Sequence, residues 1–307
     1  MCGHCFVVCP QDAKQIVDET EKVKVLLQSG DPVIVSLAPS FVANYEGVGI
    51  ESMREALKKL GFFDAEETAI GATIVKNEYE RMIDENTRDI IITSCCHSVN
   101  LLIQKYFPAE LPYLASVLSP MQAHCKRIRE KDPGAYTVFI GPCIAKKSEV
   151  KRYKDAGKVG ADYVLTFDEL YAMFLAKNID PEAMASSDVQ QGSKYGKNFA
   201  TSGGVSAAVQ EVLAEEKFDM PVSCLKCSGA AECKKALMLL RVGKLNETII
   251  EGMACEGGCV NGPAKISDVR ESVGMRRQLM LSVDDRSIAD NLEMSDFKEI
   301  DMKDGRN

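Results

Sequence analysis

The chain has 307 residues, 46% of them hydrophobic, which is enough to bury a sizeable core and to form two domains or lobes. A formal net charge of −8, without a lysine-rich or arginine-rich block, argues against a nucleic-acid partner. No apolar run is long enough to span a membrane and no signal peptide is recognisable, so the 12 cysteines indicate a reducing cytoplasm, where thiols serve as metal ligands or nucleophiles.

Three closely spaced cysteines open the chain. Cys2, Cys5 and Cys9 match the later part of the ferredoxin run Cys-x2-Cys-x2-Cys-x3-Cys-Pro, whose final cysteine ligates a second cluster. They would be incomplete ligand sets for two [4Fe-4S] clusters, with residues 1–28 the remnant of a ferredoxin-like domain and a linker helix. We infer that an electron-relay domain has been lost. The alternative is three thiols without a cluster.

Short β-branched runs alternate with helical segments along the rest of the chain. Buried strands are predicted at 33–37, 90–93, 136–140, 163–167 and 245–253. Helices are predicted at 11–28, 52–60, 72–85, 121–130, 167–176 and 205–215. The alternation is typical of an α/β fold with parallel sheets flanked by helices, in which ligands gather at the carboxyl ends of the strands.

This pattern predicts two lobes of mainly parallel sheet, at residues 29–145 and 146–280, with a metal site in the cleft between them. The polar segment 281–307 is predicted to be a surface tail or a linker to a further part of the protein.

Four cysteines follow three of the predicted strands. Cys96 comes after 90–93, Cys143 after 136–140, and Cys255 and Cys259 after 245–253. Soft thiolates on strand-end loops from distant parts of a chain can enclose an iron-sulfur cubane. The two glycines between Cys255 and Cys259 let the backbone pass close to such a cluster.

Two further stretches accompany the three cysteine segments. Ala38-Pro39-Ser40 precedes the first segment, and the run 199–205 lies between the second and the third. From about Asp31 to about Ala264, the chain resembles the catalytic domain of the [FeFe] hydrogenases, which interconvert dihydrogen with protons and electrons. The resemblance implies an H-cluster, in which Cys96, Cys143, Cys255 and Cys259 hold a [4Fe-4S] cubane. Cys259 would bridge it to a diiron subsite with carbon monoxide, cyanide and dithiolate ligands.

The same resemblance implies further site residues and partners. Cys95 would pass protons to the diiron subsite, Lys146 would donate hydrogen bonds to an iron-bound cyanide, and Glu80 would supply protons. The residues around the cofactor would be Ser40, Gly141, Phe199 and Met253. The implied partners are maturation proteins and a ferredoxin-type electron carrier, or the missing N-terminal domain. The alternatives are a packed thiol for Cys95, a surface salt bridge for Lys146 and a solvated carboxylate for Glu80.

The chain departs from the family pattern at three places. His97-Ser98-Val99 replaces Pro-Gly-Trp, Gly141 replaces a methionine, and residues 261–264 replace a glycine-rich ending. These changes are similar to those of a divergent branch associated with hydrogen sensing, and they predict slow turnover. Two alternatives remain: a non-catalytic [4Fe-4S] protein of the hydrogenase-like assembly-factor type, and a partner-binding regulatory module.

Cys224, Cys227 and Cys233 have no place in the hydrogenase pattern. Their spacing is compatible with a metal site or with a redox-sensitive set of thiols. Because no fourth ligand is obvious, simple packing is the favoured interpretation.

Overall fold

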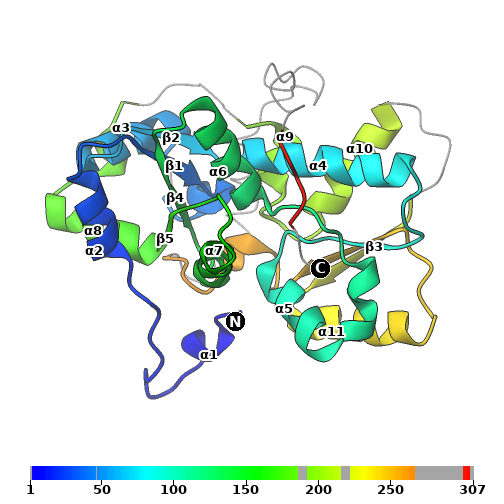
Figure 1. Ribbon diagram of the computed structural model, residues 1–307. Coiled ribbons are helices and arrows are strands. Elements are labelled where there is room, and N and C mark those ends of the chain that lie inside the picture. The colour runs from blue at the N-terminus through cyan, green and yellow to red at the C-terminus, as the bar shows by residue number, and fades with distance from the viewer. Residues whose placement is uncertain (1, 46, 186–191, 216–221, 267–299, 305–307) are drawn as a thin grey trace.

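The computed structural model describes residues 2–45, 47–185, 192–215, 222–266 and 300–304 (Figure 1). The strands are β1 Val33–Leu37, β2 Asp64–Glu67, β3 Ile91–Ile92, β4 Tyr136–Gly141, β5 Tyr163–Thr166, β6 Cys224–Ser228 and β7 Ile249–Met253. The α-helices are α1 His4–Val7, α2 Thr20–Leu27, α3 Ile50–Leu60, α4 Ala69–Asp84, α5 His97–Tyr106, α6 Pro120–Lys131, α7 Ala145–Asp155, α8 Phe167–Lys177, α9 Lys194–Asn198, α10 Gly204–Glu215 and α11 Ala230–Arg241. The 3-10 helices are η1 Pro39–Ala43, η2 Pro108–Tyr113, η3 Pro181–Ala183 and η4 Cys259–Asn261.

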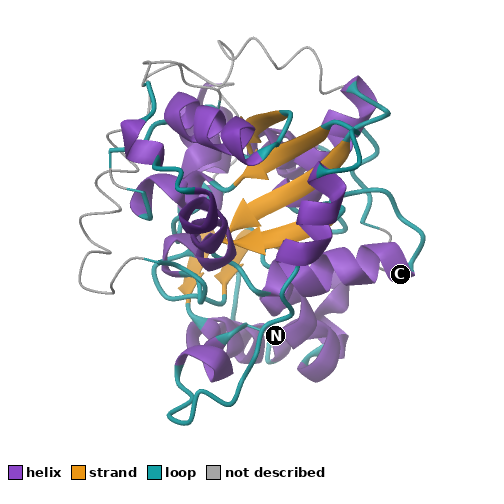
Figure 2. Ribbon diagram, turned by 90° about the vertical axis from the view of Figure 1, so that its left-hand side faces the viewer, coloured by secondary structure: helices purple, strands orange, loops and turns teal. Residues whose placement is uncertain are grey.

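The larger sheet has the order β2-β1-β4-β5, and all its strand pairs are parallel. Every residue of β1 is buried, as expected for an apolar strand inside a parallel sheet that helices cover on both faces. Figure 2 shows those helices on either side of the sheet. Helix α6 packs against β1 and β4, while α3 contacts β2 and α8 contacts β5.

The smaller sheet has the parallel order β3-β7-β6. Successive side chains of a strand point to opposite faces, so Ile91 and Ile92 enter two different cores. Ile91 joins residues of α4 and α10, whereas Ile92 joins residues of α5 and α11. The predicted fold, with parallel sheets flanked by helices, is therefore confirmed.

Each sheet contains strands from both sides of the lobe boundary that was predicted between residues 145 and 146. Strand β5 lies beyond that boundary but pairs with β4, and β3 lies before it but pairs with β7. In the predicted tail, residues 281–299 lie outside the described residues. Ile300, Met302 and Asp304 are buried, and Asp304 bonds to the Tyr153 hydroxyl, so these residues form part of the fold rather than a surface appendage.

The predicted helix over 11–28 is wrong in its first half. Helix α2 begins only at Thr20, where Asp18 accepts a hydrogen bond from the Thr20 backbone N–H at 2.8 Å. Asp12 has φ 49°, a left-handed conformation that a right-handed helix cannot contain. The sequence interpretation also left out the strands β2 and β6 and the helices α1, α5, α7, α9 and α11.

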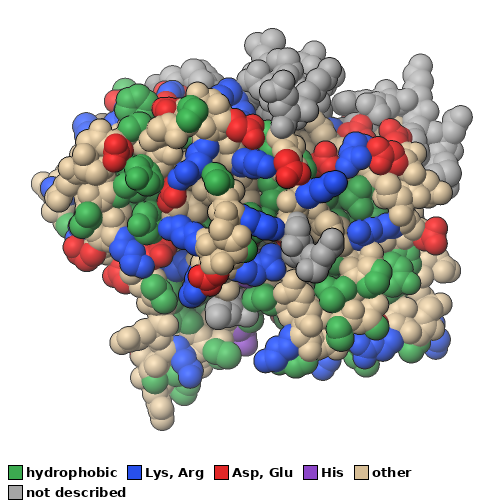
Figure 3. All heavy atoms as spheres, viewed as in Figure 1, with side chains coloured by type: hydrophobic (Ala, Val, Ile, Leu, Met, Phe, Trp, Pro, Cys, Tyr) green, Lys and Arg blue, Asp and Glu red, His purple; other side chains and the backbone are tan. Residues whose placement is uncertain are grey.

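Charged side chains of both signs occupy the face seen in Figure 3. Some basic side chains of the described residues are paired, such as Lys151 with Asp155 and Arg152 with Asp304. None of the helices in the described part of the chain is long and apolar enough to cross a lipid bilayer.

A buried polar network joins the larger sheet to α6. His124 contacts the Ser36 hydroxyl through Nδ1 at 2.8 Å and the Glu66 carboxylate through Nε2 at 3.1 Å. Arg127 donates to the same carboxylate at 2.8 Å. Burial alone would raise the pKa of Glu66, but the hydrogen bond and charge of His124 and the charge of Arg127 lower it to about 2.

We expect Glu66→Gln to lower the free energy of unfolding at pH 6 by roughly 2 to 3 kcal/mol, because the folded protein favours the charged carboxylate. A depressed carboxyl pKa stabilises the fold above the unfolded-state value and loses this effect as pH falls from about 4 to about 2. Urea unfolding across this range should therefore be less acid-sensitive in the variant. Glu21→Gln, at a side chain that is 81% exposed, is the control; equal losses in both variants would contradict the account.

Candidate metal centre

One cavity of about 100 Å³ lies where strands of both sheets end. Strand β1 leads to Ser40, β3 to Cys95 and Cys96, β4 to Cys143, and β7 ends at Met253, all of which line the cavity. Because the carboxyl ends of parallel strands meet at one edge of a sheet, this placement follows from the topology. The cavity is therefore enclosed by segments that are far apart in the sequence.

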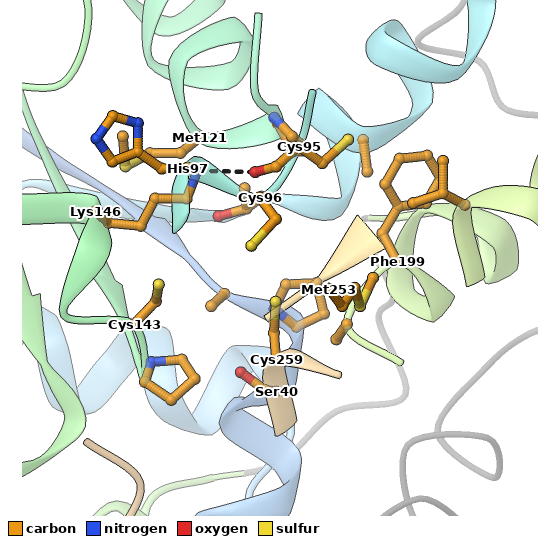
Figure 4. Close-up of a pocket in the computed structure, with 18 of the residues that line it drawn as sticks. Ser40, Cys95, Cys96, His97, Met121, Cys143, Lys146, Phe199, Met253 and Cys259 are labelled. Atoms are coloured by element: carbon orange, nitrogen blue, oxygen red, sulfur yellow. Dashed lines mark hydrogen bonds between the residues drawn. The ribbon is translucent and has the colours of Figure 1, made fainter. Parts of the chain in front are cut away.

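Three of the predicted metal ligands line this cavity. Figure 4 shows the sulfur atoms of Cys96, Cys143 and Cys259 pointing toward a common space, while the sulfur of Cys95 points toward the side of Phe199. Cys96 directly precedes α5, and Cys143 lies two residues before α7. Both thiols therefore lie beside the N-terminus of a helix, where the helix dipole favours negative charge.

Cys255 lies on the wall of a second, adjoining cavity of about 690 Å³, which Cys2 and His4 also line. Its charge nevertheless interacts with those of Cys143 and Cys96, and Cys259 interacts with all three. The four predicted ligands are thus brought together. The N-terminal segment contacts the same region, because a side chain at Gly3 would collide with Pro263.

Burial and mutual repulsion raise the pKa values of Cys143, Cys255 and Cys259. The pKa of Cys143 rises to about 11, mainly through burial. Burial and the neighbouring thiols also raise the pKa of Cys255 and Cys259, although Cys259 is exposed to the cavity. Four thiolates can share this space only if cations compensate their charge, so metal binding would release protons.

Lys146 extends into the cavity from α7. Its ammonium donates to Glu149 Oε2 at 2.7 Å and to the Cys95 carbonyl oxygen at 3.4 Å. Burial favours the neutral amine, but the charge of Glu149 outweighs that effect and raises the pKa of Lys146. Lys146 therefore remains a cation inside the protein, and a surface salt bridge does not describe it.

Cys95 contacts a residue that the sequence interpretation missed. The Tyr79 hydroxyl lies 3.4 Å from the Cys95 sulfur and 3.1 Å from the Ser94 hydroxyl. Burial raises the pKa of Cys95 to about 12, although the bond to Tyr79 and the charge of Lys146 act in the opposite direction. Cys95 is thus a protonated thiol at neutral pH.

Glu80, the predicted proton donor, does not line the cavity. Its carboxylate pairs with the buried ammonium of Lys76 at 3.0 Å. Tyr79 occupies the preceding position of α4, about 100° around the helix, and it is this residue that reaches Cys95. In the sequence, Tyr79 directly precedes Glu80 on the helix that was predicted to supply protons. That position was the signal that could have identified Tyr79 as a neighbour of Cys95.

Gly141 does not line the cavity itself, but Phe139 does. A Cβ atom at Gly141 would lie 2.8 Å from the Ala38 Cβ and 2.9 Å from the Phe139 ring. The space beside Gly141 is therefore filled by Phe139, which explains sterically why no larger residue stands there. Phe139 and Met121 are further lining residues that the sequence interpretation missed.

The donor set fits an iron-sulfur cofactor better than a single ion. Within the described ranges, no three histidine, cysteine or carboxylate side chains are close enough together to hold one metal ion. Thiolates around a cubane bind different iron atoms and so stand farther apart. The Ser40 hydroxyl is fully buried at the cavity and has no hydrogen-bond partner, which leaves a polar group for a ligand to satisfy.

Comparison with known proteins agrees with this geometry. The family described as "Iron only hydrogenase large subunit, C-terminal domain" matches residues 31–263, about three quarters of the chain. The chain belongs to the iron-only, or [FeFe], hydrogenase family. The resemblance of its cysteine segments to the H-cluster domain is thereby confirmed, whereas membership of the sensing branch stays a prediction.

Curated relatives match from half to about four fifths of the chain. The periplasmic [Fe] hydrogenase large subunit of Nitratidesulfovibrio vulgaris is 27% identical over 82% of this chain and 70% of its own length. Iron hydrogenase 1 of Clostridium pasteurianum is 29% identical over 79% of this chain, which spans about half (51%) of that relative. The cytosolic Fe-S cluster assembly factor NAR1 of Eremothecium gossypii is 26% identical over 50% of this chain and 37% of its own length.

Solved structures share the fold. A variant of the [FeFe]-hydrogenase HydA1 from Chlamydomonas reinhardtii superposes with a TM-score of 0.69 at 19% identity, covering 86% of this chain and 88% of that one. A structure described as revealing stepwise H-cluster assembly in an [FeFe]-hydrogenase has a TM-score of 0.69 at 18% identity, with coverage of 94% and 96%.

Proposed function

We propose that this protein binds an H-cluster and slowly interconverts dihydrogen with protons and electrons. The observation that carries the proposal is one cavity lined by Cys96, Cys143 and Cys259 together with a buried ammonium and an unpartnered hydroxyl. In this proposal Cys96, Cys143, Cys255 and Cys259 would hold the cubane of the cofactor, and Cys259 would lie nearest its diiron part. When bound, that cofactor supplies the redox chemistry of dihydrogen, which protein side chains lack.

The chain's own polar groups would orient the cofactor. The Lys146 ammonium is fixed by Glu149 and faces the cavity, so it can donate to an anionic ligand such as cyanide. The Ser40 hydroxyl offers a second donor. Phe199 and Met253 complete the apolar wall and exclude water from the site.

Proton movement would pass through Cys95. Its thiol holds a proton at Sγ, and the Tyr79 hydroxyl is within hydrogen-bond distance to take or return that proton. Burial raises the pKa of Cys95 to about 12, so the thiol keeps its proton at neutral pH. Glu80 remains the proposed acidic end of the route, with its carboxylate held by Lys76.

The residues around the site that depart from the family pattern support a role in sensing dihydrogen, with slow turnover as part of the same proposal. The electron partner would be a ferredoxin-type protein or an attached domain of that kind, because Cys2 interacts with Cys255 beside the adjoining cavity. Maturation proteins would supply the diiron subsite, and location in the cytoplasm stays a prediction.

Infrared spectroscopy of the full chain, matured with the family's accessory proteins, tests the proposal. We expect carbonyl and cyanide stretching bands, because only a diiron subsite carries those ligands. Lys146→Met should shift the cyanide bands and leave the carbonyl bands nearly unchanged, since the ammonium is proposed to bond to cyanide. Cys259→Ala should remove both sets of bands.

Partial similarity to the NAR1 assembly factors favours a second candidate, a non-catalytic [4Fe-4S] protein without the diiron subsite. The same spectra separate the two candidates. A reduced cubane signal in electron paramagnetic resonance, without carbonyl or cyanide bands after maturation, would contradict the hydrogenase proposal and support the second candidate.

A further inference from the structure

The strand-turn-helix unit formed by β6 and α11 contains three cysteines that the proposed function does not use. Cys224 and Cys227 are three residues apart on β6, so their side chains point to opposite faces of the sheet. Cys224 packs against the core beside α4 and α10, whereas Cys227 and Cys233 lie together in the core beside α5 and α11. The structure therefore separates one thiol from a pair.

The pair is held close by local backbone geometry. Ser228 and Gly229 turn the chain from β6 into α11, so Cys233 falls on the first turn of that helix, directly over Cys227. The Cys233 sulfur lies 4.0 Å from the Cys227 carbonyl oxygen and 3.6 Å from that of Met253. Each of the two residues is only 2% exposed.

The two thiol groups also interact directly. A hydrogen bond from the Cys233 thiol lowers the pKa of Cys227, and the same bond raises the pKa of Cys233. Cys227 is thus the more acidic thiol of the pair, and Cys233 is the one that holds its proton more strongly. In paired cysteines this asymmetry provides an attacking sulfur and a resolving sulfur.

We propose that Cys227 and Cys233 are a modification site: a dithiol that a small diffusible disulfide oxidises reversibly to an intramolecular disulfide. The Cys227 sulfur attacks one sulfur of the reagent, forming a mixed disulfide and releasing the first small thiol. The Cys233 sulfur then attacks the Cys227 sulfur and releases the second. The protein loses two electrons and two protons, and the two released thiols carry them.

The position of the pair links its redox state to the metal centre. Cys233 contacts the carbonyl oxygen of Met253, whose side chain lines the cavity, and its thiol experiences the charge of Cys96. Oxidation would draw the Cys233 sulfur toward Cys227 and away from Met253. Such a switch goes beyond the proposed hydrogenase function, because it does not depend on a diiron subsite.

The test uses the folded full chain with its iron-sulfur cluster, incubated anaerobically with 2-hydroxyethyl disulfide. The protein is then denatured, alkylated with iodoacetamide without reductant, and digested with trypsin. The peptide Cys227–Lys234 contains both cysteines of the pair, while Cys224 falls on the preceding peptide. We expect this peptide to escape alkylation and to be lighter by two hydrogen atoms, and to become doubly alkylated after reduction with dithiothreitol.

Two variants test which cysteines form the cross-link. Cys224→Ser should form the same cross-linked peptide, because its side chain lies on the opposite face of β6. In Cys227→Ser the remaining Cys233 should be alkylated after incubation. A doubly alkylated peptide from the oxidant-treated native protein would overturn the proposal, and so would a stable mixed disulfide on Cys227 without cross-linking. Either outcome leaves the infrared test of the proposed function unaffected.

Discussion

Replacing Gly258 by alanine is expected to destabilise the loop that carries Cys255 and Cys259 by at least about 3 kcal/mol and to abolish cluster binding. Gly258 has φ +103°, and a Cβ atom there would lie 2.6 Å from both the Ala200 carbonyl oxygen and the Ser202 backbone nitrogen. These are backbone atoms of the segment on which the loop rests, through bonds such as Ser202 N–H to Gly257 O at 3.1 Å. They cannot move aside as the end of a side chain could.

Gly243→Ala is the matched control, because Gly243 also has a positive φ (+65°) but has no atom within 4 Å of the added Cβ. We expect it to cost about 1 kcal/mol and to leave the cluster intact. Amide hydrogen exchange of residues 254–262 and iron content after reconstitution are the measurements. Equal iron content in the two variants would show that the close backbone contact is not required.

Replacing Glu149 by leucine is expected to lower the free energy of unfolding by about 3 to 5 kcal/mol, because Lys146 would then be a buried cation without its carboxylate. The pair is almost enclosed, with side-chain exposures of 11% for Lys146 and 6% for Glu149. Burial alone would raise the pKa of Glu149, but the charge of Lys146 lowers it, so both groups are charged in the fold. Urea unfolding of the chain without cofactor measures the effect.

The double variant Lys146→Met/Glu149→Leu should recover most of this loss, since an apolar pair replaces a buried ion pair at little cost. Asp155→Asn, which removes the partner of the exposed Lys151, should change stability by less than about 1 kcal/mol. A double variant as unstable as the sum of its single variants would contradict the assigned ion pair.

Apolar periodicity predicts the elements that bury hydrophobic side chains. Strands β1 and β4 consist largely of β-branched and aromatic residues, so their pattern indicates buried strands correctly. Strand β2 reads Asp-Ala-Glu-Glu, which has low strand propensity, and its partners lie elsewhere in the chain. Arg54 bonds to Asp64 and Lys197 pairs with Glu67, so tertiary contacts override local preference.

Sequence motifs predict the cysteines of the site better than its supporting contacts. Cys96, Cys143, Cys255 and Cys259 are recognisable because each follows an apolar run. The contact between Tyr79 and Cys95 depends on how α4 is rotated about its axis, which the sequence constrains only loosely. Glu149 is visible three residues after Lys146, but only the fold shows that both are buried.

The account depends on thiols from three distant segments meeting at one iron-sulfur cluster. The most direct measurement is iron content and electron paramagnetic resonance of the reduced, reconstituted chain, with Cys2, Cys5 and Cys9 replaced by serine to remove the N-terminal thiols. We predict about four irons per chain and a cubane signal that is lost in Cys96→Ala, Cys143→Ala, Cys255→Ala or Cys259→Ala but kept in Cys125→Ala. A signal that survives replacement of Cys143 together with Cys259 would contradict the account.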